Sequence, residues 1–210
     1  MGTMERRARQ KKLLREEILD AARELFLKYG YENVSMRKIA EKIEYSPTTI
    51  YLYFKDKAEI LDTLCDETFN RLWKIMVDIE HGAGDPLTRL RRQGLAYIRF
   101  GLEHPNHYQV TFMMPHDYAG KTPQEMAESP GMRTFQSLVN CVKACVDARQ
   151  FRELDILAAS QALWCAVHGV TSLLIAQFCF PWIEKEQLIS TLLDAMLEGY
   201  RPLSKASQRK

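Results

Sequence analysis

Apolar side chains recur along much of this chain at three- and four-residue spacing, the period of one face of an α-helix. The spacing predicts a helix over residues 16–29, with Gly30 ending it. Past Pro86 no segment carries a strand signal. The same spacing predicts further helices over residues 57–80, 87–102, 105–114, 131–149, 155–180 and 184–200. The pattern therefore predicts an all-α fold of about nine helices.

Residues 35–54 predict two short helices joined by a tight turn. The first carries its apolar residues at helical spacing: Met36, Ile39, Ala40 and Ile43. Ser46 followed by Pro47 predicts a new start, because serine caps a helix and proline is tolerated at its first position. The second helix would bury Ile50 and Phe54 and leave its hydroxyl and tyrosine side chains outside. Such a pair is typical of a helix-turn-helix, whose second helix enters the major groove of DNA.

Composition adds a local charge to this picture. The 210 residues are 46% hydrophobic, which is enough for a sizeable core, and the net charge is only +2. Any affinity for nucleic acid must therefore come from local charge. Residues 5–15 hold six Lys or Arg and one Glu. On composition this is either a solvated, frayed terminus or an arm that lies along phosphates or enters a minor groove, and its position before the helix-turn-helix favours the arm.

Several kinds of protein find little support in the sequence. No apolar run reaches the roughly 18 residues of a membrane span, and no secretory signal is visible. Five cysteines, an odd number, then indicate free thiols in a reducing cytoplasm. We find no nucleophile, phosphate-loop or dinucleotide motif, so we expect neither an enzyme nor a cofactor.

Two groups of side chains raise the question of a metal site or a thiol switch. His104, His107, His116 and Asp117 match no strong zinc spacing, so we expect no metal. Cys141 and Cys145 lie one helical turn apart, either as a thiol switch or, the favoured alternative, as buried structural residues.

The region after residue 60 is rich in aromatic and methionine side chains. An adaptable ligand cavity between helices is lined in this way. Trp164 and His168 are four residues apart and share a helix face, so His168 is either the polar anchor of such a cavity or a core histidine bonded to a carbonyl. The candidate ligand-binding residues are Trp73, Tyr97, Phe100, Tyr108, Phe112, Trp164 and His168.

The last two predicted helices carry more apolar surface than one domain of this size needs. Paired with the same helices of a second copy, they would form a four-helix, two-fold interface. The candidate interface residues are Val170, Leu174, Gln177, Ile189, Leu192, Leu193 and Met196.

The motifs resemble those of a known family. Residues 14–64 resemble the DNA-binding head of TetR-family transcriptional regulators, through Ile39-Ala40, Tyr51-x-x-Phe54 and Lys57-x-x-Ile60-Leu61. The later segments His104-Pro105, Tyr108 and Trp164-Cys-Ala-Val-His168-Gly169 are similar to the Trp/His/Gly-motif ligand-binding domain found in such regulators. The resemblance implies a cytoplasmic homodimer that binds a palindromic operator, usually as a repressor, and releases it when a small molecule occupies the second domain.

These expectations give a two-part chain, with a helix-turn-helix DNA-binding domain and basic N-terminal arm over residues 1–60 and a ligand-binding and dimerisation domain over residues 61–210. Its partners would be double-stranded operator DNA, a small apolar or aromatic effector, and a second copy, without a membrane. A rival interpretation is a small-molecule-binding or sequestering protein whose head no longer binds DNA.

The expected DNA contacts divide into two kinds. Thr48 and Thr49 are placed for base edges or nearby phosphates, and Tyr45, in the turn, would also reach a base. The resemblance assigns phosphate contacts to Tyr51, Tyr53 and Lys57, with Ser35 and Arg37 on the opposite side of the groove. The alternative for Tyr51 or Tyr53 is a place in the core of the head.

Overall fold

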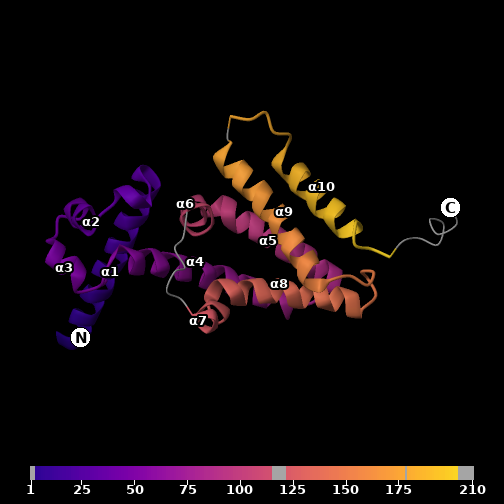
Figure 1. Ribbon diagram of the computed structural model, residues 1–210, viewed down its shortest axis with the longest axis horizontal. Coiled ribbons are helices and arrows are strands. Elements are labelled where there is room, and N and C mark those ends of the chain that lie inside the picture. The colour runs from indigo at the N-terminus through magenta and orange to yellow at the C-terminus, as the bar shows by residue number, and fades with distance from the viewer. Residues whose placement is uncertain (1–2, 115–121, 178, 203–210) are drawn as a thin grey trace. The chain divides into compact units, whose positions relative to one another are not determined.

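The computed structural model describes residues 3–114, 122–177 and 179–202. The described residues form ten α-helices without a β-strand, together with a single-turn 3-10 helix η1 (Tyr31–Asn33) and a short π-helix η2 (Gln109–Met113) (Figure 1). The all-α expectation is confirmed. The turn expected near residues 124–128 is the helix α7 (Pro123–Ala127). Residues 115–121 of the expected loop, including His116 and Asp117, and residues 203–210 of the expected tail lie outside the described residues.

The chain divides into two compact units. One comprises Met1–Thr68 with Pro105–Tyr118, and the other comprises Phe69–His104 with Ala119–Lys210. The chain passes directly from one unit to the other within the helix α4 (Lys57–Glu80) and again at His104–Pro105. The functional boundary expected at residue 60 stays a prediction.

The first unit is a helical head built on α1 (Thr3–Tyr29). The helix α2 (Met36–Lys42) packs against α1, and so do α6 (Pro105–Tyr108) and η2, while α3 (Pro47–Tyr51) packs against α2. The core side chains are those that the helical spacing predicts; the exposed fractions of Ile18, Phe26, Ile39, Ile50 and Ile60 are all 0%. Burial of this apolar stripe is what holds the short α2 and α3 in place, because helices this short are marginal alone.

Local signals in the sequence set the ends of these helices. Gly30 has φ +77°, a backbone angle that glycine adopts without strain, and its N–H donates to the Phe26 carbonyl at 2.9 Å. The Ser46 hydroxyl accepts from the Thr49 amide at 3.2 Å and caps α3, as predicted. Asp56 caps α4 by accepting from the Glu59 amide at 2.9 Å.

The basic segment before residue 16 belongs to the helix α1, which begins at Thr3. The frayed alternative is therefore wrong for the described residues, and the role of the segment as an arm on DNA stays a prediction. Residues 4–15 read Met-Glu-Arg-Arg-Ala-Arg-Gln-Lys-Lys-Leu-Leu-Arg, and every one of these residues is a good helix former. The helix propensity of these residues explains why the segment is helical despite its charge.

The second unit is a helical bundle around α5 (Pro86–Glu103). The helix α5 contacts α8 (Pro130–Asp147), α9 (Ile156–Ala176) and α10 (Lys185–Glu198). Gly94 of α5 faces Leu193 of α10, and a Cβ atom at Gly94 would lie 2.7 Å from Leu193 Cδ2. The absence of a side chain at Gly94 therefore lets these two helices approach closely.

The helix α9 has an unusual amount of exposed apolar surface. It contains no Asp, Glu, Lys or Arg, and only 33% of its most apolar 18-residue window is buried. By length and composition it would suffice to cross a membrane, which the sequence analysis did not anticipate. A single such helix is weak evidence for a membrane, because core helices of soluble proteins can be equally long and apolar.

Candidate DNA-binding surface and effector site

The outer surface of the head presents α3 and the turn before it. Thr48 is exposed, and the exposed fractions of Tyr45 and Tyr51 are 44% and 55%. The Thr49 hydroxyl lies 2.9 Å from the Ser46 hydroxyl, so the helix cap fixes its position. Buried Ile50 holds the other side of α3 in the core. The head therefore offers hydroxyl and phenol groups on a short helix, with their backbone anchored from behind.

Other predicted DNA contacts are partly engaged within the head. The Ser35 hydroxyl caps α2 by accepting from the Lys38 amide at 3.3 Å, and Arg37 Nε donates to Glu41 Oε1 at 2.9 Å on the exposed side of α2. Tyr53 is half-buried. The core alternative is thus wrong for Tyr51, while Tyr53 has both a packed and an open side.

Lys57 is held in place at the start of α4. Its ammonium donates to the Tyr31 carbonyl at 2.8 Å and lies 4.1 Å from the centroid of the Tyr31 ring. An ammonium has three N–H donors, so the bond to Tyr31 leaves donors for a phosphate. Because the bond already fixes the side chain, less rotamer freedom is lost when a phosphate binds.

Two features of the candidate DNA-binding surface were not predicted from the sequence. Leu52, next to Tyr51, has an exposed fraction of 74% and offers an apolar group of the kind that contacts thymine methyls. Glu44, in the turn between α2 and α3, has φ +60°, a conformation that costs a non-glycine residue energy. Spacing alone gave no signal for either, because Leu52 is apolar and Glu44 is not a turn-forming residue.

In the second unit, a chain of hydrogen bonds joins three of the predicted ligand-binding residues. Trp164 Nε1 donates to the Tyr97 hydroxyl at 3.2 Å, and this hydroxyl lies 3.4 Å from His168 Nδ1. His168 Nε2 lies 3.3 Å from the Ser172 hydroxyl. An indole N–H only donates, so the Tyr97 oxygen accepts from Trp164, and either ring nitrogen of His168 can carry the proton in its contacts with Tyr97 and Ser172.

The surroundings of this chain combine apolar and polar character. Trp164 has an exposed fraction of 40%, and the Phe135 ring lies 6.1 Å from it between centroids. Phe135 and Ser172 were not among the predicted residues. Ser172 follows His168 by one helical turn, a spacing that could have indicated it.

Burial lowers the pKa of His168 from its ordinary value. The unfolded chain therefore binds a proton more readily than the folded chain, and folding stability should fall as the pH drops below about 6.5. Urea unfolding of the wild type and His168→Gln between about pH 7.5 and 5.5 checks this, with a smaller loss expected in the variant. An equal loss in both proteins would show that the other titrating groups account for it.

The remaining predicted ligand-binding residues have other neighbours. The Arg133 guanidinium lies 4.9 Å from the centroid of the Trp73 ring, and the Phe100 and His104 rings lie 5.1 Å apart. Tyr108 and Phe112 belong to the first unit, where their rings are 4.7 Å apart. The structure thus joins Tyr97, Trp164 and His168 directly to one another, and the roles of the other four stay predictions.

Several of the predicted interface residues lie inside their own chain. The exposed fractions of Val170, Leu174, Ile189 and Leu193 are 9%, 6%, 4% and 4%. Their apolar spacing reflects packing of α9 and α10 within the unit, so these four side chains are not free to cover a partner. Leu192 and Met196 are half-buried and Gln177 is exposed.

Cys141 and Cys145 are buried structural thiols. Burial raises the pKa of Cys141 to about 11 and that of Cys145 to about 12, so both thiols stay protonated at neutral pH and are weak nucleophiles. Among the described residues no group of three His, Cys, Asp or Glu side chains is arranged to hold a metal ion.

Comparison with known proteins gives two family matches. Residues 18–64 match the family described as "Bacterial regulatory proteins, tetR family", and residues 90–199 match "Tetracyclin repressor-like, C-terminal domain". The first match contains α2, α3 and the start of α4, and the second contains the Tyr97, Trp164 and His168 cluster.

Individual proteins agree with these matches. An HTH-type transcriptional regulator of Saccharopolyspora erythraea is 28% identical over 173 residues, which cover 80% of this chain but less than two thirds, 64%, of that protein. The class D tetracycline repressor protein of Escherichia coli is 37% identical over 60 residues, or 29% of this chain and 28% of the repressor.

A solved structure supports the fold. The TetR family transcriptional regulator PfmR of Thermus thermophilus superposes with a TM-score of 0.70 at 22% identity, covering 86% of this chain and 97% of PfmR. Together with the two family matches, these findings show that the chain belongs to the tetR family of helix-turn-helix DNA-binding transcriptional regulators.

Proposed function

We propose that this regulator is a repressor that binds a palindromic operator as a homodimer and is released by a small apolar or aromatic effector. The observation that carries the DNA-binding part is the exposed α3 surface, with Thr48 and Tyr51 outward and Lys57 held beside it. Repression and release rest on the family resemblance, as does the Trp/His/Gly type of the second domain. The proposed location is the cytoplasm, where operator DNA and reduced thiols are found.

The exposed face of α9 supports the homodimer. Small residues recur on this face at helical spacing: Ala158, Ala162, Cys165, Gly169 and Ala176. A Cβ atom at Gly169 would meet no atom within 4 Å, so space is open there for an approaching helix. We therefore move the proposed interface from the buried residues of α9 to this exposed face. A two-fold pairing would place two α3 helices about one DNA turn apart, roughly 34 to 36 Å or somewhat more.

The Tyr97, Trp164 and His168 cluster supports the effector site. Its rings provide apolar surface, and its hydroxyl and imidazole provide polar groups that orient a ligand. An aromatic effector would stack on Trp164 and exchange hydrogen bonds with the Tyr97 and His168 chain. His168 contacts the Tyr97 and Ser172 hydroxyls, and the alternative of a core histidine bonded to a carbonyl stays open.

The helix α4 supports coupling between effector and DNA. Within the second unit, Gln93 Nε2 donates to the Met76 carbonyl at 3.0 Å, and the Ser137 hydroxyl donates to Glu80 Oε2 at 2.6 Å. These bonds tie the end of α4 to α5 and α8, so a rearrangement of the bundle would move α4. Since α4 starts at Lys57 in the head, we propose that effector binding shifts the head and misaligns the two reading helices.

Two variants separate phosphate contacts from base contacts. Lys57→Ala should weaken binding to every duplex and make the salt dependence shallower by about two units, because one phosphate contact is lost in each head of the dimer. Thr49→Ala should instead change the order of preference among operator sequences. Fluorescence anisotropy on a panel of duplexes measures both, and a Lys57→Ala protein with unchanged affinity for every duplex would contradict the assignment.

Selection of duplexes from a random pool tests the proposed function. The wild-type protein should enrich a palindromic sequence, and a compound that binds the second unit should then lower the affinity for that duplex. A protein that binds small aromatic compounds but prefers no duplex over random DNA would favour the rival function, a sequestering protein. A compound that binds tightly yet leaves operator affinity unchanged would contradict the coupling.

A further inference from the structure

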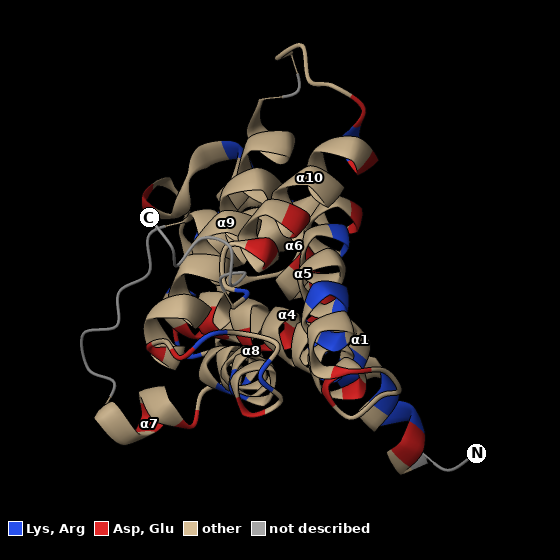
Figure 2. Cartoon of the chain, turned by 90° about the vertical axis from the view of Figure 1, so that its right-hand side faces the viewer, with Lys and Arg blue, Asp and Glu red and all other residues tan. Residues whose placement is uncertain are grey.

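The helix α1 projects beyond the segment that matches the family. The family match begins at residue 18, whereas α1 begins at Thr3. Every residue from 4 to 13 is exposed. The cations of this projection are Arg6, Arg7, Arg9, Lys11 and Lys12, accompanied by a single acidic residue, Glu5. Figure 2 shows their basic colour along the N-terminal end of α1. We call residues 3–14 the basic extension.

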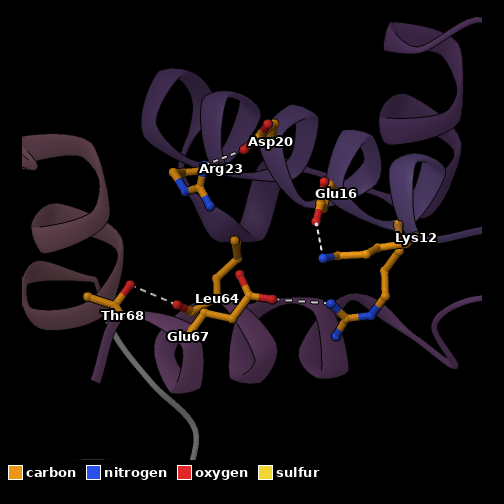
Figure 3. A network of polar contacts seen from close by, with 8 residues as sticks. Lys12, Glu16, Asp20, Arg23, Leu64, Glu67 and Thr68 are labelled. Atoms are coloured by element: carbon orange, nitrogen blue, oxygen red, sulfur yellow. Dashed lines mark hydrogen bonds and ion pairs between the residues drawn. The ribbon is translucent and has the colours of Figure 1, made fainter. Parts of the chain in front are cut away.

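Contacts at residue 15 fix the basic extension to the head. Arg15 Nη1 lies 3.1 Å from Glu67 Oε1 of α4, and Figure 3 shows Glu67 with this contact as a dashed line. The Arg15 guanidinium lies 5.2 Å from the centroid of the Phe54 ring. Ile18 and Leu19, in the next turn, are buried. At about 1.5 Å per residue the extension is roughly 18 Å long. It is a helical projection with a fixed direction, and Figure 1 shows the N-terminal end of α1 reaching past α3.

The charges of the basic extension are available to a partner. Within the described part of the chain, no ion pair engages Arg6, Arg7, Arg9 or Lys11. Lys12 makes only a long contact with Glu16, at 3.8 Å. The helix period places Arg7 and Lys11 on one side and Arg6 and Arg9 toward the other, so that the cations surround the helix. This arrangement suits rows of phosphates better than a single anionic group.

We propose that the basic extension binds the phosphate backbone of DNA that flanks the operator. This inference rests on the proposed function, because α3 must first place the head on DNA. An α-helix with its side chains is about 10 to 12 Å wide, whereas the minor groove is about 6 Å wide, so the helix lies across the groove edges and does not enter the groove. Contacts of this kind raise affinity and lengthen the bound segment without reading sequence.

A five-fold variant tests the extension. Arg6, Arg7, Arg9, Lys11 and Lys12 are all changed to glutamine, which keeps helix propensity. Binding is measured by anisotropy between about 50 and 200 mM salt, on a selected operator duplex with long flanks and on one trimmed to the operator. If two phosphate contacts are lost from the dimer, one in each head, the salt slope becomes shallower by about two units, and affinity for the flanked duplex falls roughly tenfold more at the lower salt than at the higher salt. The trimmed duplex should show little change, and the order of sequence preference should stay the same.

A matched control carries the same change of net charge in other parts of the chain. Lys74, Arg92, Lys143, Arg149 and Lys185 are exposed, and their replacement by glutamine removes five charges outside the extension. This control should retain the difference between flanked and trimmed duplexes. A second variant, Gln10→Pro, keeps every cation but interrupts the helix, and it should lose part of the affinity gained from the flanks.

Three results would overturn the inference. They are an unchanged salt slope in the five-fold variant, an equal loss on flanked and trimmed duplexes, and a changed sequence preference. If the wild-type protein selects no sequence at all, the operator proposal fails separately. The salt dependence of binding is then measured on random duplexes. The five-fold variant should still have a shallower salt slope than the wild type, and an unchanged slope would refute the role of the basic extension.

Discussion

Replacing Gly169 by arginine is expected to leave the folded monomer intact and to abolish high-affinity operator binding. A Cβ atom at Gly169 meets nothing within 4 Å in the monomer, and any residue other than proline favours a helix more than glycine does. In the proposed dimer, however, the arginine would lie between two closely packed helices as an unpaired buried charge. The protein should then be a monomer by analytical ultracentrifugation. Because a lone head loses the gain from binding two half-sites together, operator affinity should fall by about 10²- to 10⁴-fold.

A control variant separates this effect from the added charge itself. Ala127→Arg places the same side chain at an exposed position of α7, away from the small-residue face of α9. It should remain dimeric and bind the operator normally. A Gly169→Arg protein that stays dimeric with full operator affinity would exclude this face of α9 as the interface.

Replacing Gly94 by leucine is expected to destabilise the second unit. Even a single Cβ atom at Gly94 would lie 2.7 Å from Leu193 Cδ2, and Leu193 is itself buried, so it has little room to move. Overpacking of this kind costs about 1 to 3 kcal/mol. The free energy of unfolding, measured by chemical denaturation with circular dichroism, should fall by that amount, and Tm should fall by roughly 2 to 4 °C per kcal/mol.

A double-mutant cycle makes the cause specific. Leu193→Ala alone should cost about 2 to 5 kcal/mol through the cavity that it leaves. In the double variant the leucine at position 94 fills part of that cavity. The loss in its free energy of unfolding should therefore be smaller than the sum of the two single losses. Strict additivity would show that Gly94 and Leu193 do not compete for the same volume.

In the head, local sequence signals predict several helix ends. Gly30, Ser46 and Asp56 each act within one helical turn, so the ends of α1, α3 and α4 were predictable from neighbouring residues alone. The apolar spacing likewise identified the core, since a helix has only one side to bury. The all-α fold therefore followed from the sequence, and the DNA contacts of α3 stay a prediction.

Other features depended on which side chains meet across helices. Apolar spacing on α9 and α10 marked Val170, Leu174, Ile189 and Leu193 as interface residues, but such spacing cannot tell a face that packs within the chain from one that packs on a partner. The bonds of Tyr97 with Trp164 and His168 join residues about seventy positions apart, which no local pattern specifies.

By itself, the sequence determined that this protein is an all-α regulator with a helix-turn-helix head, because helix period, caps and family motifs are local properties. Only the tertiary structure decided that the basic segment is fixed at Arg15, that Lys57 is held by Tyr31, and that space is open beside Gly169 of α9. Each of these depends on contacts between residues distant in the chain, whose distances and directions arise only when the helices pack.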